Sequence, residues 1–264
     1  MEDSQLDLGI SGRSALVLGG TQGLGFGCAR TLAEAGVKVA VNGRDATKAQ
    51  AAADEIGAGA VAVSGDISDP KARREIIAAA RAALGQITIL VTNAGGPPPG
   101  PVEDHEADVW LKALATNMLP AIEFARQLLP DMRNEGFGRI VNVTSFTVRE
   151  PYPNMGVATG VRAGLTGAMR SLSHEVASDG ITVNNLLPGL MDTGALERVY
   201  TAQAKAKGIT AQVAKDTMAQ SVPMRRLGRA EDFGPACAFL CSVHAAYITG
   251  QNLTVDGGLS RPLL

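Results

Sequence analysis

Cysteine is scarce in this chain of 264 residues, which contains only Cys28, Cys237 and Cys241 and no C-x-x-C pattern. So few thiols, in an odd number, argue against a disulfide framework and favour a reducing compartment. Cys237 and Cys241 are one helical turn apart, but no histidine or acidic pattern near them completes a metal site. We therefore expect three thiols in the core and no bound metal.

An excess of positive charge and long apolar runs are also missing. The formal net charge is −2 and no basic stripe is visible, which argues against a nucleic-acid partner. No run of 18 apolar residues exists, so we expect no membrane span. Residues 1–8 are acidic and lack the basic start and apolar core of a secretory leader. These absences predict a soluble cytoplasmic protein whose partner is a small-molecule substrate.

Short apolar runs alternate with helical patterns along the whole chain, without an internal repeat or a linker. This order predicts an α/β fold with a parallel sheet, right-handed crossovers and helices on both faces. We expect a single Rossmann-type, doubly wound domain over 1–264, with mostly seven strands and a helical substrate flap at about 190–222. Strands are predicted near 14–18, 37–41, 60–63, 87–92, 139–145, 181–187 and 251–255, and later helices near 46–57, 70–84, 106–134, 155–178 and 230–242.

The segment 14–36 combines an apolar strand, a glycine-rich turn and the start of a helix. Gly19, Gly23 and Gly25 occupy the turn, where backbone N–H groups and the positive end of a helix dipole meet. This arrangement predicts a phosphate site of the dinucleotide-binding kind. The alternative is a tight connection between strand and helix with nothing bound.

Seven ordered motifs resemble the short-chain dehydrogenase/reductase family over nearly the whole chain, and within it the oxoacyl-reductase-like branch. They are Gly19-x-x-x-Gly23-x-Gly25, Asp66-Ile67, Asn93-Ala94-Gly95, Asn117, Ser145, Pro188-Gly189 with Thr193, and Thr249-Gly250 through Val255-Asp256-Gly257-Gly258. The resemblance implies a homotetramer or homodimer. It also implies the cofactor-binding residues Gly19, Thr21, Gln22, Gly23, Leu24, Gly25, Arg44, Asp66, Ile67, Asn93, Ala94, Gly95, Arg162, Pro188, Gly189 and Thr193.

Individual roles follow from the same resemblance. Asp66 is expected to bond the adenine amino group, 93–95 to flank the adenine ribose, and Pro188-Gly189 with Thr193 to meet the nicotinamide. The plainer alternatives are a polar strand end for Asp66 and an ordinary turn for Pro188-Gly189.

Cofactor choice depends on Gly43 and Arg44. Family members that use NAD carry an acid at the end of the second strand, where it bonds the ribose 2′-hydroxyl. Gly43 occupies that position here, and the guanidinium of Arg44 follows, well suited to a 2′-phosphate. We expect NADP(H), with NAD(H) possible if Arg44 is only a solvated surface charge. Asp45 is predicted to cap the next helix.

The catalytic helix departs from the family pattern. The family has a tyrosine some 13 residues after its serine and a lysine four residues later, on one helix face. This chain keeps Ser145 but has Ala158 and Arg162 at those two positions. Arg162 can clamp the ribose and stabilise an alkoxide. It cannot donate a proton at neutral pH.

Another group must therefore move the proton. Tyr152, seven residues past Ser145, is the first candidate, although it can also simply line the pocket. A water held through Asn117 and bonded to Ser145 is the second candidate. We predict an atypical NADP-dependent oxidoreductase that interconverts a carbonyl and a hydroxyl group, with Ser145, Arg162, Asn117 and Tyr152 as catalytic residues. The alternative is a nucleotide-binding relative without turnover, acting as a sensor or structural protein.

Overall fold

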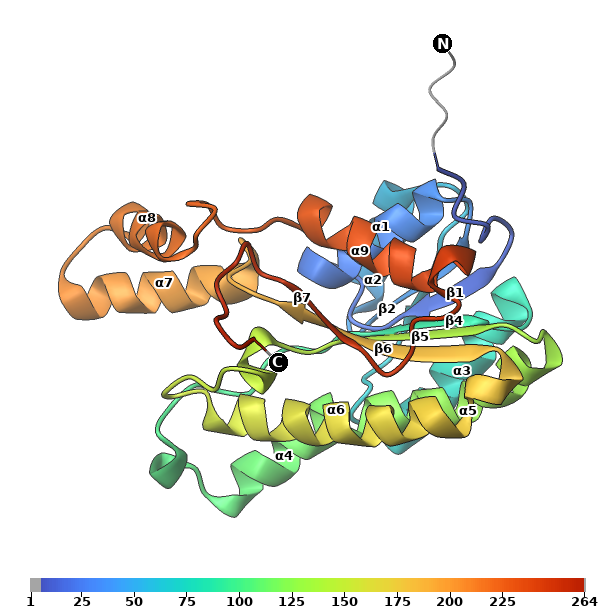
Figure 1. Ribbon diagram of the computed structural model, residues 1–264, viewed down its shortest axis with the longest axis horizontal. Coiled ribbons are helices and arrows are strands. Elements are labelled where there is room, and N and C mark those ends of the chain that lie inside the picture. Colours follow the sequence, from blue (N-terminus) through green and yellow to red (C-terminus); the bar gives the residue numbers. More distant parts are fainter. Residues whose placement is uncertain (1–5, 264) are drawn as a thin grey trace, which may run out of the picture.

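Seven parallel strands form one sheet in the order β3-β2-β1-β4-β5-β6-β7 (Figure 1). The computed structural model describes residues 6–263. The predicted Rossmann-type α/β fold is confirmed. The strands are β1 (Ser14–Val17), β2 (Lys38–Gly43), β3 (Val61–Ser64), β4 (Ile89–Thr92), β5 (Gly138–Val143), β6 (Ile181–Pro188) and β7 (Asn252–Val255).

Helices cover both faces of the sheet, because strands buried on two sides send alternate apolar side chains to each face. Ala15 and Val17 point into the core beneath α1, α2 and α9, whereas Leu16 and Leu18 point into the core beneath α3, α5 and α6 (Figure 1). The helices are α1 (Gly23–Glu34), α2 (Ala46–Ile56), α3 (Pro70–Leu84), α4 (Ala107–Asn117), α5 (Leu119–Asn134), α6 (Gly156–Glu175), α7 (Gly194–Lys207), α8 (Ala211–Ser221) and α9 (Ala230–Cys241), with short 3-10 turns η1 (Val102–Asp104), η2 (Phe146–Val148), η3 (Ala177–Asp179) and η4 (Val243–Ala245).

The predicted cap at Asp45 is confirmed, and the helix predicted near 70–84 begins with a similar cap at Asp69. The Asp45 carboxylate accepts the backbone N–H of Lys48 at 3.0 Å, and Asp69 accepts that of Lys71 at 2.8 Å. Each cap satisfies a backbone donor that the first turn leaves unpaired. Pro70 follows Asp69 in the first turn of α3, where its missing N–H costs nothing.

The long helix predicted over 106–134 is wrong in one respect, because the chain breaks it into α4 and α5. The break falls at Met118, whose φ of −113° and ψ of −59° depart from helical values. Pro120 follows two residues later, in the first turn of α5, and proline cannot donate the backbone bond that a continuous helix needs there. The break leaves Asn117 as the last residue of α4.

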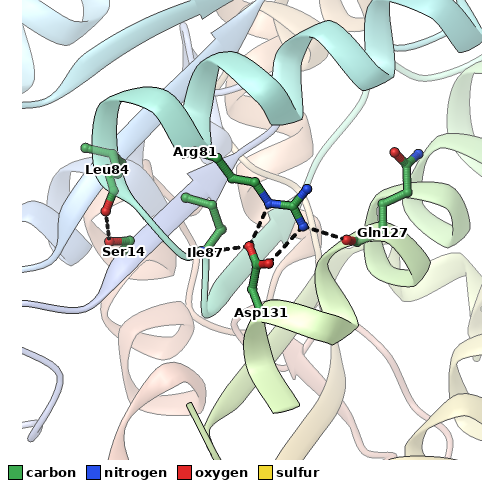
Figure 2. Close-up of polar contacts among 6 residues, drawn as sticks. All are labelled: Ser14, Arg81, Leu84, Ile87, Gln127 and Asp131. Atoms are coloured by element: carbon green, nitrogen blue, oxygen red, sulfur yellow. Dashed lines mark hydrogen bonds and ion pairs between the residues drawn. The ribbon is translucent and has the colours of Figure 1, made fainter. Parts of the chain in front are cut away.

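An ion pair joins α3 to α5 beneath the sheet (Figure 2). Both arms of the Arg81 guanidinium reach the Asp131 carboxylate at 2.9 Å, and Arg81 also donates to the Gln127 carbonyl. Asp131 accepts the backbone N–H of Ile87 at 3.1 Å, just before β4 begins. This bidentate pair fixes the entry of β4, whose far end reaches the candidate site.

Helices α7 and α8 project from the body of the protein (Figure 1), and they occupy most of the predicted flap at 190–222. They pack on each other through Tyr200, Ala204 and Ala214, and Lys215 bonds Asp192 at 2.6 Å. Elsewhere, the three cysteines are buried as expected. From residue 6 to residue 263, no helix is both long and apolar enough to span a membrane. Residues 1–5 of the acidic N-terminal segment lie outside the described residues.

Candidate active site

The glycine turn after β1 is closed by backbone atoms that leave no room for side chains. A Cβ on Gly25 would lie 2.2 Å from the carbonyl oxygen of Gly19, which itself has a φ of +57°. The Asn93 amide donates to that same oxygen at 3.0 Å and so ties the turn to the end of β4. The turn therefore requires glycine, as the sequence predicted.

The N-terminus of α1 is open to an anion. The helix begins at Gly23, the Gln22 side chain makes no capping bond, and no acidic residue stands in the first turn. The first backbone N–H groups thus lack intrahelical partners and carry the positive end of the helix dipole. Thr21, Gln22 and Leu24 lie within this turn, and Thr193 lies beside it, 3.4 Å from a Cβ built on Gly23.

The end of β2 excludes an acidic side chain. A Cβ on Gly43 would lie 2.3 Å from Cγ2 of Thr21, so glycine is required by packing. The next residue, Arg44, is exposed, and its guanidinium has no hydrogen-bond or carboxylate partner within residues 6–263. This edge of the site therefore presents a free cation and no carboxylate at residue 43.

Asp66 is exposed at the rim of the same edge, after β3. Its Oδ1 accepts the backbone N–H of Ser68 at 2.9 Å and the Ser68 hydroxyl at 2.8 Å. These two bonds, aided by the charge of Arg44, lower the pKa of the Asp66 carboxyl. The carboxylate is thus ionised at neutral pH, and its second oxygen has no partner among the described residues.

A narrow hollow of about 20 Å³ brings several predicted residues together at the carboxyl ends of the strands. That volume is enough for about one water molecule. Ile67, Asn93, Ala94, Asn117 and Arg162 all line it. Gly95 follows Ala94 directly in the loop after β4. The other lining residues are Leu18, Thr92, Thr116, Pro120, Ala121, Val143 and Leu165.

Arg162 is a cation without a partner in this hollow. Burial lowers the pKa of its guanidinium, and no carboxylate or hydrogen-bond acceptor for it lies within residues 6–263. The guanidinium lies against the loop after β4, where a Cβ on Gly96 would be 3.6 Å from Nη2. An unpaired and partly buried charge is costly, so the position favours an incoming oxygen ligand.

Ser145 and Tyr152 do not line this hollow. Ser145 is 8% exposed, and its Oγ accepts the backbone N–H of Thr147 at 3.2 Å and the Thr147 hydroxyl at 3.0 Å. Its own hydroxyl proton remains available. Tyr152 is 42% exposed, with its ring edge-on to Phe146 at 5.2 Å between centroids.

Asn117, Pro188 and Gly189 complete the predicted set. Asn117 is 8% exposed and its amide donates to the Thr116 hydroxyl at 2.7 Å, which leaves its oxygen free. Gly189 donates its N–H to the carbonyl of Val255 at 3.0 Å, so the Pro188-Gly189 turn is held against the last strand.

Comparison with known proteins identifies the family of the chain. A family model described as "Enoyl-(Acyl carrier protein) reductase" matches residues 19–260. The 3-oxoacyl-[acyl-carrier-protein] reductase FabG of Escherichia coli (strain K12) is 33% identical over 252 residues, which are 96% of this chain and 99% of the relative. The chain belongs to the short-chain dehydrogenase/reductase family.

Two further proteins are similar over nearly their full length. The NADPH-dependent reductase BacG of Bacillus subtilis (strain 168) is 32% identical over 264 residues, with 96% of this chain and 100% of the relative covered. The crystal structure of L-sorbose reductase from Gluconobacter frateurii, complexed with NADPH and L-sorbose, superposes with a TM-score of 0.93 at 27% identity. That match covers 98% of this chain and 100% of the other. The expected membership of the family is confirmed.

Ala158, the residue that the resemblance places at the position of the family tyrosine, carries no titratable group. Ala158 is 3% exposed on α6. Its neighbours Val157 and Val161 pack with Ala113 of α4, which fixes the rotation of the helix. Arg162 follows one turn later and faces the hollow. The helix is therefore held in place by packing that needs no tyrosine at residue 158.

Sequence reasoning missed a chain of buried polar side chains across the strands. Thr92 donates to Asn142 at 2.8 Å, Asn142 donates to Asn185 at 3.1 Å, and Asn185 donates to Asn252 at 2.8 Å. The chain runs from the hollow to the edge strand β7. Amides inside apolar strand segments were the available signal, because a buried amide must find partners.

Proposed function

We propose that this chain is an NADP(H)-dependent oxidoreductase that interconverts a carbonyl and a hydroxyl group, with a proton donor other than the family tyrosine. One observation carries the proposal. The unpartnered guanidinium of Arg162 shares a hollow with Asn93, Ala94 and Asn117, at the carboxyl ends of the strands. A cation kept free of carboxylates at that place is suited to ribose hydroxyls and to an oxyanion.

The start of α1 and the ends of β2 and β3, which we call the dinucleotide edge, fit a phosphorylated dinucleotide. The N–H groups at the start of α1 would hold the pyrophosphate, since side chains are excluded at Gly19 and Gly25. Arg44 would grip the 2′-phosphate, and the free oxygen of Asp66 would accept from the adenine amino group. NADPH in the description of BacG and in the L-sorbose reductase complex supports this choice over NAD(H).

The bound cofactor would supply or accept the hydride, and the protein handles the charge and the proton. Arg162 stabilises the substrate oxygen as it becomes anionic, but its guanidinium keeps its own proton. The proton comes from Tyr152, or from a water held at Asn117 and hydrogen-bonded to Ser145.

We propose further that the chain forms one domain, that α7 and α8 cover the substrate, and that the protein assembles as a homotetramer or homodimer.

A turnover assay tests the proposal. The protein is mixed with NADPH, then with NADH, and absorbance at 340 nm is followed with ketones, keto-sugars and oxoacyl thioesters, and in reverse with the matching alcohols. We expect oxidation of NADPH with at least one carbonyl class. NADPH binding without turnover in either direction would instead support the sensor or structural alternative. Full activity of Tyr152→Phe would leave the water at Asn117 as the proton route.

A second candidate is reduction of a carbon–carbon double bond conjugated to a carbonyl. Ala158 favours it, because hydride added at the β carbon leaves an enolate whose oxygen needs stabilisation rather than protonation by the enzyme. Arg162 would hold that oxygen, and water would protonate the α carbon to give the saturated carbonyl compound. The description of the matching family model agrees with this reaction class.

Isotope labelling separates the two candidates. With NADPH deuterated at the transferred position and an enone as substrate, conjugate reduction places deuterium on the β carbon of a saturated ketone. Carbonyl reduction places it on the carbinol carbon of an allylic alcohol. Mass spectrometry and proton NMR of the product distinguish the two outcomes.

A further inference from the structure

A second, larger hollow lies between the end of η2, the middle of α6 and the start of β7. Its volume is about 400 Å³, and it is lined by Arg149, Thr166, Gly167, Arg170 and residues 250–252. It shares no lining residue with the hollow that contains Arg162. The volume falls within the range of small-molecule sites, about 300–1,000 Å³.

The charged groups around this hollow are all cations. Arg149 and Arg170 line it, and no aspartate or glutamate does. Six arginines elsewhere in residues 6–263 reach a carboxylate within 4.0 Å, whereas Arg149 and Arg170 reach none. The six are Arg13, Arg30, Arg81, Arg126, Arg133 and Arg226. In a chain whose net charge is −2, this concentration of unpaired positive charge points to an anion.

Arg170 is positioned by the backbone of the β7 edge. Its Nη1 donates to the Gly250 carbonyl at 2.7 Å, which leaves its other N–H groups without an acceptor among the described residues. Gly250 has a φ of +68°, and a Cβ there would lie 2.3 Å from that Nη1. Glycine is therefore required both for the backbone conformation and for the close approach of the guanidinium.

One further donor lines the hollow. Asn252 uses its amide oxygen to accept from Asn185 at 2.8 Å, which leaves its N–H groups unpaired within residues 6–263. The Thr166 hydroxyl donates its one proton to the carbonyl of Arg162 at 2.8 Å, so it offers no donor to the ligand. Two guanidinium groups and an amide donor, with no competing carboxylate, match an oxyanion of charge −2.

We propose that this hollow binds the phosphate group of a small phosphate monoester. Two guanidinium forks pair with a dianionic phosphate, and a hollow of about 400 Å³ leaves room for an organic body beyond the phosphate itself. The site is separate from the dinucleotide edge and does not depend on the proposed oxidoreductase activity. Thr166 bonds to the backbone of Arg162, so the ligand lies one helical turn from the candidate catalytic residue.

Isothermal titration calorimetry tests the site, with NADPH present at saturation so that the dinucleotide edge is blocked. The probes are inorganic phosphate, glycerol 3-phosphate and 4′-phosphopantetheine, with glycerol and pantetheine as uncharged controls. We expect the phosphate esters to bind and the controls not to bind. Tighter binding of phosphopantetheine than of glycerol 3-phosphate would indicate a monoester with a long organic body, and the reverse order a monoester with a short one.

Matched variants make the test specific. Arg149→Gln and Arg170→Gln should each weaken phosphate-ester binding about ten-fold or more, since each removes one charge-assisted contact. Arg74→Gln, an exposed arginine on α3 outside the hollow, should change nothing. Within residues 6–263 the Arg149 guanidinium bonds no side chain, so Arg149→Gln tests the site without risk to the fold. Equal binding in all variants would overturn the proposal. So would Arg170→Gln changing only the oligomeric state, which would assign the hollow to a second copy.

Discussion

The dinucleotide edge and the catalytic face of α6 are built in opposite ways. At the edge, function rests on missing side chains, because a Cβ on Gly25 or Gly43 would lie within 2.3 Å of another atom. On α6, the proposed function rests on side chains that are present, and Arg162 lines a hollow in which no residue between 6 and 263 pairs with it. A surface made of backbone tolerates almost no change, whereas the proposed catalytic face of α6 has Ala158 at the expected tyrosine position and is still packed through Val157 and Val161.

The largest effect should come from adding one methyl group to the edge. In Gly25→Ala the new Cβ would meet the Gly19 carbonyl at 2.2 Å, so the turn must open. We expect NADPH affinity, measured by fluorescence titration, to fall more than about 100-fold, and the free energy of unfolding to fall by about 1–3 kcal/mol.

Gly167→Ala on α6 is the matched control, because among residues 6–263 no atom outside its chain neighbours and the backbone of its own helix lies within 4 Å of the added Cβ. We expect no loss of affinity, and a small gain in stability from the better helix propensity of alanine. Wild-type affinity in Gly25→Ala would show that the edge is less rigid than its contacts indicate.

The next effect tests the catalytic face. Arg162→Met removes the cation of the hollow while keeping its bulk, and we expect kcat to fall about 100-fold, as for the loss of an oxyanion donor. Stability in urea should stay equal or rise, because the guanidinium is partly buried and unpaired.

Arg162→Lys should recover much of the rate, since an ammonium restores the charge, and Arg74→Met on α3 should leave both rate and stability unchanged. A lower stability in Arg162→Met with an unchanged rate would reverse the contrast between the two regions, because Arg162 would then support the fold rather than the reaction.

A smaller effect tests the cofactor preference of the dinucleotide edge. Arg44→Gln should lower the preference for NADPH over NADH about ten-fold or more, because a guanidinium bond to phosphate contributes about 1.5–3 kcal/mol. The measurement is kcat/KM with each cofactor. Lys48→Gln, which removes an exposed cation in the first turn of α2, is the control and should leave the ratio unchanged. An unchanged ratio in Arg44→Gln would make Arg44 a solvated surface charge.

The sequence could predict those features that depend on residues close together in the chain. Local chemistry determined the caps at Asp45 and Asp69 and the need for glycine at residues 19 and 25, and each of these depends only on near neighbours in the chain. The order of strands and helices followed from apolar periodicity for the same reason. The break at Met118 was missed, although Pro120 signalled it, because the apolar pattern continues across it.

Features that need distant segments could not be predicted. The edge-on contact of Tyr152 with Phe146 depends on how a proline-rich loop folds back. The pairing of Asn142 with Asn185 depends on the register of β5 against β6. Arg149 and Arg170 are 21 positions apart in the sequence, and only the packing of α6 beside β7 brings them to one hollow.

The smallest effect is a pH dependence of stability, which we expect at the support of the dinucleotide edge and not at Arg162 on α6. Hydrogen bonds from Arg226, with help from the backbone N–H of Arg229, lower the pKa of Asp232 to about 2. This carboxylate caps α9, which packs closely on α1, since a Cβ on Gly27 would lie 2.8 Å from Ala230. Because the pKa is lower in the folded state, the stabilisation is complete above the unfolded pKa of about 3.9 and is lost as the pH falls toward 2.

Asp232→Asn should therefore lower the free energy of unfolding by about 1 kcal/mol at pH 7, a modest value because the pair is partly exposed. The difference from wild type should shrink between about pH 4 and pH 2, as urea denaturation at several pH values would measure. Glu231→Gln, which loses a single bond to Arg30 at 3.2 Å, should cost less. Arg162 keeps its charge throughout this range, so acid weakens the support of the dinucleotide edge without changing the charge of the catalytic face. A constant difference between Asp232→Asn and wild type at every pH would mean that the carboxylate acts through packing rather than through its charge.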